Sequence, residues 1–146
     1  MNVKEIKYHV DRAIQCVYAH DAVLFEIGAS EWAIAHRLAV YLEHMLPEWN
    51  VDCEYNRQGL GRNPKTNELN KRVRPDITVH HRGKPAVEHN LLVIELKKRE
   101  EESDWTKVCE LTKPPSGKRP FQYQYGLALS FFPNLEVHWY EKGNSA

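Results

Sequence analysis

The chain has 146 residues, of which 42% are hydrophobic and 27% are charged, and its 20 basic side chains balance its 20 acidic ones. This length and composition predict a single domain over residues 1–146 and exclude a disordered chain. Balanced charge excludes binding to nucleic acid or membrane through bulk charge alone. No uncharged apolar stretch reaches about 18 residues, so we expect no membrane span and no membrane partner.

Two helices are predicted in the first third of the chain. Ile6, Val10, Ile14 and Val17 recur every three or four residues, which indicates an amphipathic helix over residues 3–20. A short apolar piece, AVLFEIG, follows and breaks at Gly28. Ser30 then suits the N-cap of a second helix, which carries an apolar face formed by Ile34, Leu38, Tyr41, Leu42 and Met45 and ends before Pro47.

Five strands and a third helix follow. Residues 50–56 alternate between apolar and polar, as a half-buried strand does, and residues 57–74 read as a loop. Further strands are predicted over 75–81, 90–98, 124–132 and 135–141, with a turn over 82–89 and a short helix ending near Thr112. This order predicts an α/β fold of the mixed α+β kind, with a central mixed sheet of about five strands flanked by helices.

The strand over residues 90–98 ends with charged side chains. Glu95 and Lys97 are two apart, so they share a face. If the strands 75–81 and 90–98 form a hairpin around residues 82–89, opposing residue numbers add up to 171, and Asp76 lies across from Glu95 with Cβ atoms about 5 Å apart. The same register pairs residue 80 with 91 and residue 81 with 90.

Two carboxylates this close repel each other unless something compensates for their charge. A shared proton, a neighbouring cation such as Lys97, or a bound metal ion would each do so. An oxygen-rich group of this kind suits Mg²⁺ or Mn²⁺.

Pro75-Asp76 followed by Glu95-x-Lys97 at the end of an apolar strand resembles the motif of the PD-(D/E)XK nuclease superfamily, which has the restriction-endonuclease-like fold. The core of that fold runs helix, three antiparallel strands, helix, strand, and residues 30–132 follow this order after an extra N-terminal helix. Small uncharacterised bacterial or phage members are the most similar in overall pattern.

The resemblance implies hydrolysis of phosphodiester bonds in DNA with Mg²⁺ or Mn²⁺ as cofactor. Asp76, Glu95 and Lys97 would be catalytic, and Glu31, Asp76, Glu95 and the carbonyl of Leu96 would bind metal. Glu31 also suits the positive end of a helix, and Glu54 is a competing fourth ligand. Some superfamily members carry a QxxxY motif, but residues 122–125, QYQY, have a different spacing; Gln122 remains a candidate for substrate contact.

The loop before Asp76 is basic, since residues 57–74 hold six Lys or Arg residues and one acid, Glu68. Solvent exposure alone explains many charge runs, but this loop leads into the candidate site, so we expect it to contact phosphates. The candidate nucleic-acid-binding residues are Arg57, Arg62, Lys71, Arg72, Arg74 and Gln122. Lys113, Lys118 and Arg119 form a second basic stretch.

Other chemistry-bearing residues favour structural roles. His80 and His81 are adjacent strand residues that point to opposite faces, which disfavours a shared zinc ion. Cys53 and the four tryptophans, Trp32, Trp49, Trp105 and Trp139, are interpreted as core residues. Three widely spaced cysteines without a CxxC pair, and no signal peptide, predict a reducing cytoplasmic location.

Two classes of function therefore stand side by side. The first is a metal-dependent deoxyribonuclease whose partner is DNA. The second is an inactive nuclease-fold subunit that binds or assembles. A single small domain leaves little surface for reading a DNA sequence. A nuclease of this size would therefore act as a homodimer or with a separate subunit that recognises the DNA.

Overall fold

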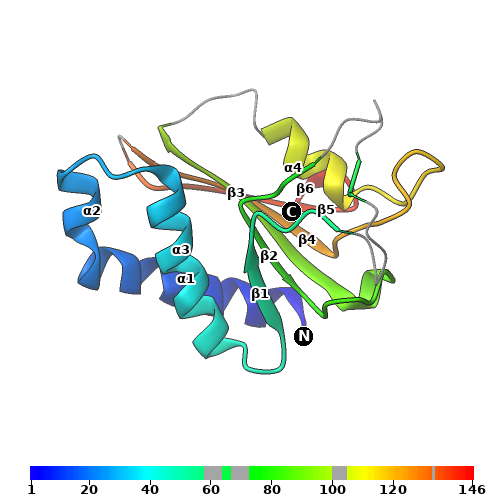
Figure 1. Cartoon of the computed structure of the whole chain (residues 1–146), viewed down its shortest axis with the longest axis horizontal. Helices are drawn as coiled ribbons and strands as arrows, with labels where there is room; N and C mark the ends of the chain where they lie inside the picture. Colours follow the sequence, from blue (N-terminus) through cyan, green and yellow to red (C-terminus); the bar gives the residue numbers. More distant parts are fainter. Residues whose placement is uncertain (58–63, 67–72, 100–104, 133) are drawn as a thin grey trace.

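The computed structural model describes residues 1–57, 64–66, 73–99, 105–132 and 134–146 (Figure 1). Its helices are α1 (Val3–His20), α2 (Ala22–Glu26), α3 (Glu31–Met45) and α4 (Trp105–Thr112), with a short 3-10 helix, η1 (Val87–His89). Its strands are β1 (Asn50–Cys53), β2 (Ile77–His80), β3 (Asn90–Arg99), β4 (Tyr125–Phe132), β5 (Glu136–Glu141) and β6 (Asn144–Ser145).

The strands form one mixed sheet in the order β1-β2-β3-β4-β5-β6. All neighbouring strands are antiparallel except β3 and β4, which are parallel and are connected through α4 (Figure 1). The predicted mixed sheet flanked by helices is therefore confirmed. The sixth strand was not predicted because β6 is only two residues long and follows a tight reversal at Lys142 and Gly143, both with positive φ.

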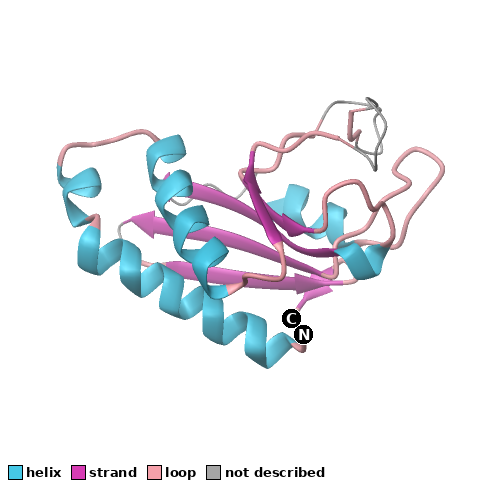
Figure 2. Ribbon diagram, turned by 60° about the horizontal axis from the view of Figure 1, so that its bottom comes forward, coloured by secondary structure: helices cyan, strands magenta, loops and turns pink. Residues whose placement is uncertain are grey.

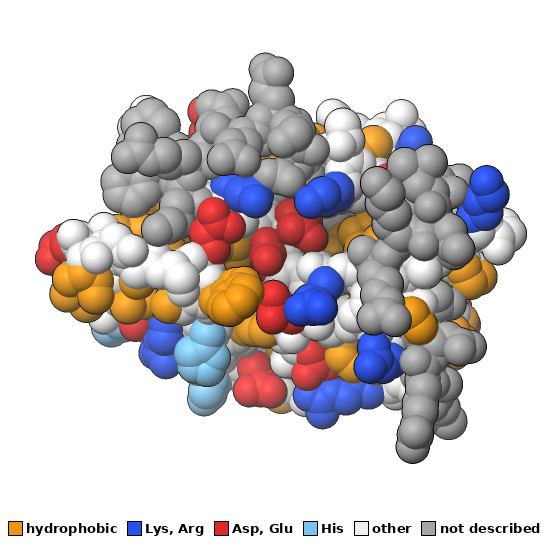
Figure 3. Space-filling model, turned by 45° about the horizontal axis from the view of Figure 1, so that its top comes forward, with side chains coloured by type: hydrophobic (Ala, Val, Ile, Leu, Met, Phe, Trp, Pro, Cys, Tyr) orange, Lys and Arg blue, Asp and Glu red, His pale blue; other side chains and the backbone are white. Residues whose placement is uncertain are grey.

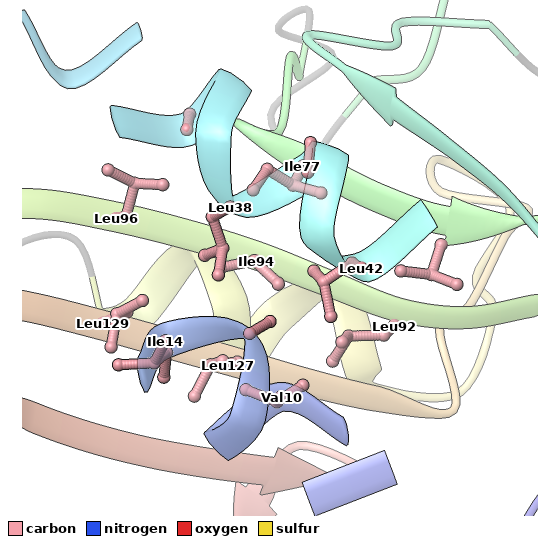
Figure 4. Packing of buried hydrophobic residues seen from close by; sticks show 14 of the residues in the cluster. Val10, Ile14, Leu38, Leu42, Ile77, Leu92, Ile94, Leu96, Leu127 and Leu129 are labelled. Carbon is pink, nitrogen blue, oxygen red and sulfur yellow. The ribbon is translucent and has the colours of Figure 1, made fainter. Parts of the chain in front are cut away.

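Helices α1 and α3 cover one face of the sheet (Figure 2). Their predicted apolar faces supply Val10 and Ile14 from α1 and Leu38 and Leu42 from α3, and all four side chains are buried. They pack on alternate residues of the central strands, as Figure 4 shows for Ile77, Leu92, Ile94, Leu96, Leu127 and Leu129. Each such buried side chain contributes roughly 1.5–3 kcal/mol relative to an exposed one.

Helix α4 covers the opposite face, over a smaller core. Val108 and Leu111 of α4 pack there against Val93 of β3 and Tyr123. The helix lies very close to β4, since a Cβ atom on Gly126 would be 2.5 Å from Cγ1 of Val108. The two faces of β3 are thus both buried, which explains the continuous apolar run from Leu91 to Ile94.

The helix boundaries follow from capping. Asn2 caps α1 and pairs with Glu5 in a capping box, and the Ser30 hydroxyl accepts a hydrogen bond from the amide of Ala33 at 3.3 Å. The predicted extents of α1 and α3 are confirmed. Residues 22–26 form the helix α2. None of the helices in the described part of the chain could span a membrane.

The strands before the candidate site are shorter than predicted. β1 ends at Cys53 rather than residue 56, because Glu54 adopts a left-handed conformation with φ of 52°. β2 begins at Ile77, one residue after Asp76. A register shift between Val79 and His80 pairs His80 with Asn90, so the predicted pairings of residue 80 with 91 and residue 81 with 90 are wrong.

Candidate active site

The register of β2 and β3 brings Asp76 and Glu95 together. Ile77 pairs with Ile94, Thr78 with Val93 and Val79 with Leu92, and every pair adds up to 171, as the hairpin prediction required. Continued by one residue, this register places Asp76 opposite Glu95. The irregularity at His80 lies at the other end of the hairpin and does not disturb the pair.

The end of β3 holds the Asp76 carboxyl group in place. Its Oδ2 accepts the backbone N–H of Leu96 at 2.8 Å. The Glu95 carboxyl group lies close enough to affect the pKa of Asp76. Two neighbouring carboxylates repel each other unless a proton, a cation or a metal ion compensates for their charge.

The surroundings keep the pKa of Asp76 above its ordinary value. Burial is the largest cause, and the negative charge of Glu54 adds to it. The bonds from Leu96 and Glu95 oppose the rise in the pKa, as does the positive charge of Lys97. Lys97 is therefore close enough to Asp76 for its positive charge to lower the pKa of that carboxyl group.

Lys97 also links the pair to helix α3. Its Nζ lies 3.9 Å from Oε2 of Glu31, and the two side chains are 27% and 34% exposed. Such a long, partly exposed ion pair contributes little to stability, about 0–1 kcal/mol. It does bring Glu31, the first residue of α3, to the same rim of the sheet as the end of β3. The candidate side chains Glu31, Asp76, Glu95 and Lys97 thus lie near one another.

Glu54 contacts Asp76 directly through the backbone. Its backbone N–H donates to the carbonyl oxygen of Asp76 at 3.1 Å, and both residues line one small pocket together with Trp32, His36 and Cys53. Its positive φ is uncommon for a residue other than glycine, and such strain is concentrated at functional sites. Nothing in the local sequence, CEYN, would have indicated this backbone conformation.

These residues fit a hydrated divalent ion better than a fully enclosed one. In the part of the chain that the structure describes, no group of three or more His, Cys, Asp or Glu side chains is arranged to hold a metal ion. Mg²⁺, however, commonly takes only one or two carboxylates from the protein and keeps its other ligands as water and substrate phosphate. Asp76 and Glu95 in their ionised form, with the neighbouring carbonyl of Leu96, meet that requirement.

A second cleft adjoins the acid pair and carries two of the predicted nucleic-acid-binding residues. Arg57 and Arg74 line it together with Glu54, and both arginines are exposed. Figure 3 shows a group of acidic side chains near the middle of one face, with Lys and Arg side chains beside it. Three other predicted contacts, Arg62, Lys71 and Arg72, lie outside the described residues.

Several other predicted cations and polar groups have structural partners. The side-chain amide of Gln122 donates to the carbonyl of Thr112 at 2.9 Å. The guanidinium of Arg119 is fully buried and donates to the carbonyls of Phe121, Pro114 and Lys113, beyond the end of α4. Arg119 therefore does not belong to an exposed basic stretch with Lys113 and Lys118. Its guanidinium instead binds backbone carbonyls of the segment that follows α4.

The interpretation of Trp32 and Cys53 as core residues is also wrong. Trp32 is 68% exposed in the first turn of α3, and it lines the pocket of Asp76. Cys53 is exposed at the end of β1. Although the residue as a whole is exposed, partial burial of its thiol and the charges of Asp52 and Asp76 raise the pKa of Cys53, so its thiol is not an activated nucleophile.

The two adjacent histidines have separate partners, as expected from strand geometry. Nε2 of His80 lies 2.8 Å from Oδ2 of Asp52, which also pairs with Arg82. The ring of His81 stacks on Trp49 with centroids 4.0 Å apart, and its Nδ1 lies 3.0 Å from Nδ1 of His89.

No protein-family model, no curated protein and no solved structure matches the chain.

Proposed function

We propose that this chain is a divalent-metal-dependent nuclease of the PD-(D/E)XK kind, which hydrolyses phosphodiester bonds in DNA. One observation carries the proposal. The β2–β3 register and the bond from the Leu96 N–H to Asp76 bring Asp76 next to Glu95 at the rim of the sheet, where the charge of Lys97 acts on Asp76. Withdrawing two acids and a lysine partly from solvent at one place costs stability, and a structural role does not explain that cost.

In this proposal Asp76 and Glu95 bind Mg²⁺ or Mn²⁺ through carboxylate oxygens, with the carbonyl of Leu96 beside them. Glu31, beside Lys97, and Glu54, beside Asp76, would bind waters of the ion rather than the ion itself. When bound, such an ion lowers the pKa of a coordinated water and neutralises charge on the phosphate. Because the pKa of Asp76 is raised by burial, metal binding competes with a proton at this carboxyl group and strengthens as pH rises.

Lys97 supplies the remaining chemistry. Its positive charge acts on Asp76, and its Nζ lies 3.9 Å from Oε2 of Glu31. From there it orients the attacking water or stabilises negative charge that develops on the phosphate in the transition state. Removing one such electrostatic contact typically lowers the rate by roughly 10²–10³-fold.

The experiment that tests this function is plasmid nicking with Mn²⁺ or Mg²⁺. We expect nicking by the wild-type protein, a loss of about 10²–10³-fold in Lys97→Ala, and no loss in Lys4→Ala, which removes an exposed lysine from α1. An unfolded variant is recognised by its circular dichroism spectrum. If the wild-type protein cleaves neither DNA nor RNA with either metal, the nuclease proposal is wrong and the inactive binding or assembly subunit takes its place.

A further inference from the structure

A third pocket lies beyond the two clefts of the candidate active site. Its lining comes from the segment after β1, the end of β2, the turn that follows it and the segment before β4. Five basic side chains contribute to it: Arg57, Lys65, His80, His81 and Lys84. Among the described residues, no Asp or Glu lines this pocket, whereas the two neighbouring clefts contain Asp52, Glu54 and Asp76.

The cations of this pocket differ in how they are held. Arg57 and Lys84 are exposed and reach the pocket from two different loops. Lys65 is 3% exposed, and its ammonium donates a hydrogen bond to the hydroxyl of Tyr123. Nζ of Lys65 lies 4.9 Å from the ring centroid of Tyr55 and 5.8 Å from that of Phe121, and both rings line the pocket.

A buried ammonium surrounded by aromatic rings is costly without an anion. Asp52 is the acid whose charge acts on Lys65, but Asp52 already pairs with Arg82 and His80. Burial lowers the pKa of Lys65 to about 8, which reflects the incomplete compensation. An anionic ligand in the pocket would supply the missing negative charge.

The pocket is connected to the acid pair. The pocket of Asp76 and the middle cleft share Cys53 and Glu54, and the middle cleft and the basic pocket share Tyr55 and Arg57. Along β2 the distance from Asp76 to His80 is four residues, or about 13 Å. That length corresponds to roughly four nucleotides of a stacked strand.

We propose that this basic pocket binds a phosphate group of the nucleic-acid strand that is cleaved at Asp76 and Glu95. The identity of the strand rests on the proposed nuclease function, but the affinity for phosphate does not. The phosphate belongs either to the end of the strand, as a monoester, or to its interior, as a diester. Arg57 and Lys84 contact it from the open side, while Lys65 provides a buried positive charge behind it.

The first test uses inorganic phosphate and requires neither metal nor turnover. Wild-type protein is titrated by calorimetry beside two double variants with the same change in charge. The pocket variant is Arg57→Gln/Lys84→Gln, and the control is Lys4→Gln/Arg12→Gln, which removes two exposed cations from α1. We expect affinity to fall about tenfold or more in the pocket variant and less than twofold in the control.

The second test locates the phosphate in the strand. Single-stranded oligonucleotides with a 5′-phosphate, a 3′-phosphate or only hydroxyl ends are titrated without divalent metal into Asp76→Asn protein, with and without the pocket substitutions. A terminal phosphate predicts tighter binding of one phosphorylated form, and the preference disappears in the pocket variant. An internal phosphate predicts equal weakening for all three oligonucleotides, with the salt dependence of log K reduced by about 2.

The outcomes separate this inference from the proposed function. Equal affinities of the pocket variant and the control for phosphate and for all oligonucleotides would overturn the pocket, even if Lys97→Ala abolishes nicking. Phosphate binding that depends on Arg57 and Lys84 would support the pocket, even if the protein cleaves no nucleic acid.

Discussion

At the scale of single residues, the surroundings of Asp76 change the pKa of its carboxyl group. Its pKa is raised, chiefly by burial, relative to an ordinary value of 3.8. An acid with a raised pKa in the folded state favours folding when protonated, and its ionisation opposes folding. The free energy of unfolding therefore falls as pH rises from about the ordinary pKa through the raised one, and the full loss is present above that range.

We therefore expect Asp76→Asn to be more stable than the wild-type protein at pH 7.5 in the absence of metal. The amide oxygen can still accept the N–H of Leu96, and its NH₂ can donate to Glu95. The difference should shrink toward acid pH, where wild-type Asp76 is protonated. Urea unfolding at a series of pH values measures it, with Asp11→Asn on α1 as the control for lost charge; a variant that is less stable than the wild-type protein at pH 7.5 contradicts the raised pKa.

Trp32 stands exposed at the pocket of Asp76, where an indole ring could stack on an unpaired base. Base stacking on an aromatic side chain contributes roughly 1–3 kcal/mol per base. Trp32→Ala should therefore weaken binding of single-stranded DNA about tenfold or more, while Trp32→Phe keeps most of the affinity. Because the side chain is 68% exposed, the free energy of unfolding should change by less than about 0.5 kcal/mol.

Fluorescence anisotropy of labelled DNA measures this affinity. Tyr8→Ala is the matched control, since Tyr8 is a 58% exposed aromatic residue on α1. Equal affinities of the Trp32→Ala and Tyr8→Ala proteins would exclude stacking on Trp32.

At the scale of elements, the closeness of α4 to β4 defines the second core. A methyl group at Gly126 would meet Cγ1 of Val108 at 2.5 Å and Cγ2 of Thr112 at 2.9 Å. We expect Gly126→Ala to destabilise the protein by about 1–3 kcal/mol through overpacking, as measured by urea unfolding. Gly117→Ala is the control, because a methyl group there would meet no atom of the described residues within 4 Å apart from its chain neighbours. An equal effect of both substitutions would show that α4 is not tightly packed.

The element boundaries illustrate what local sequence can predict. The apolar repeat in α1 and the cap at Ser30 depend on neighbouring residues only, and both were predicted correctly. The β2–β3 register near Asp76 was predicted by placing a hairpin turn at residues 82–89, and the pairs from Ile77–Ile94 to Val79–Leu92 follow it. The shift at His80 was not, because it depends on long-range contacts, such as the stacking of His81 on Trp49.

At the scale of the whole molecule, the sequence predicted the layered fold and the meeting of Asp76 with Glu95. It named Glu54 as a candidate ligand but did not predict its left-handed backbone, the exposure of Trp32 or the burial of Arg119. Charge offers the clearest example. Lys65 and Arg57 read alike in the basic loop, yet one is buried against Tyr123 and the other is exposed.

The central claim is that Asp76 and Glu95 together bind a divalent cation. A crystal soaked in Mn²⁺ at pH 7.5 or above tests it most directly through the anomalous signal of the metal, because metal binding is favoured at a pH that favours ionised carboxyl groups. We predict a peak about 2.0–2.2 Å from a carboxylate oxygen of each residue, and no such peak in Asp76→Asn crystals. Wild-type crystals without a peak between the two carboxylates, or with manganese bound only elsewhere, would contradict the claim.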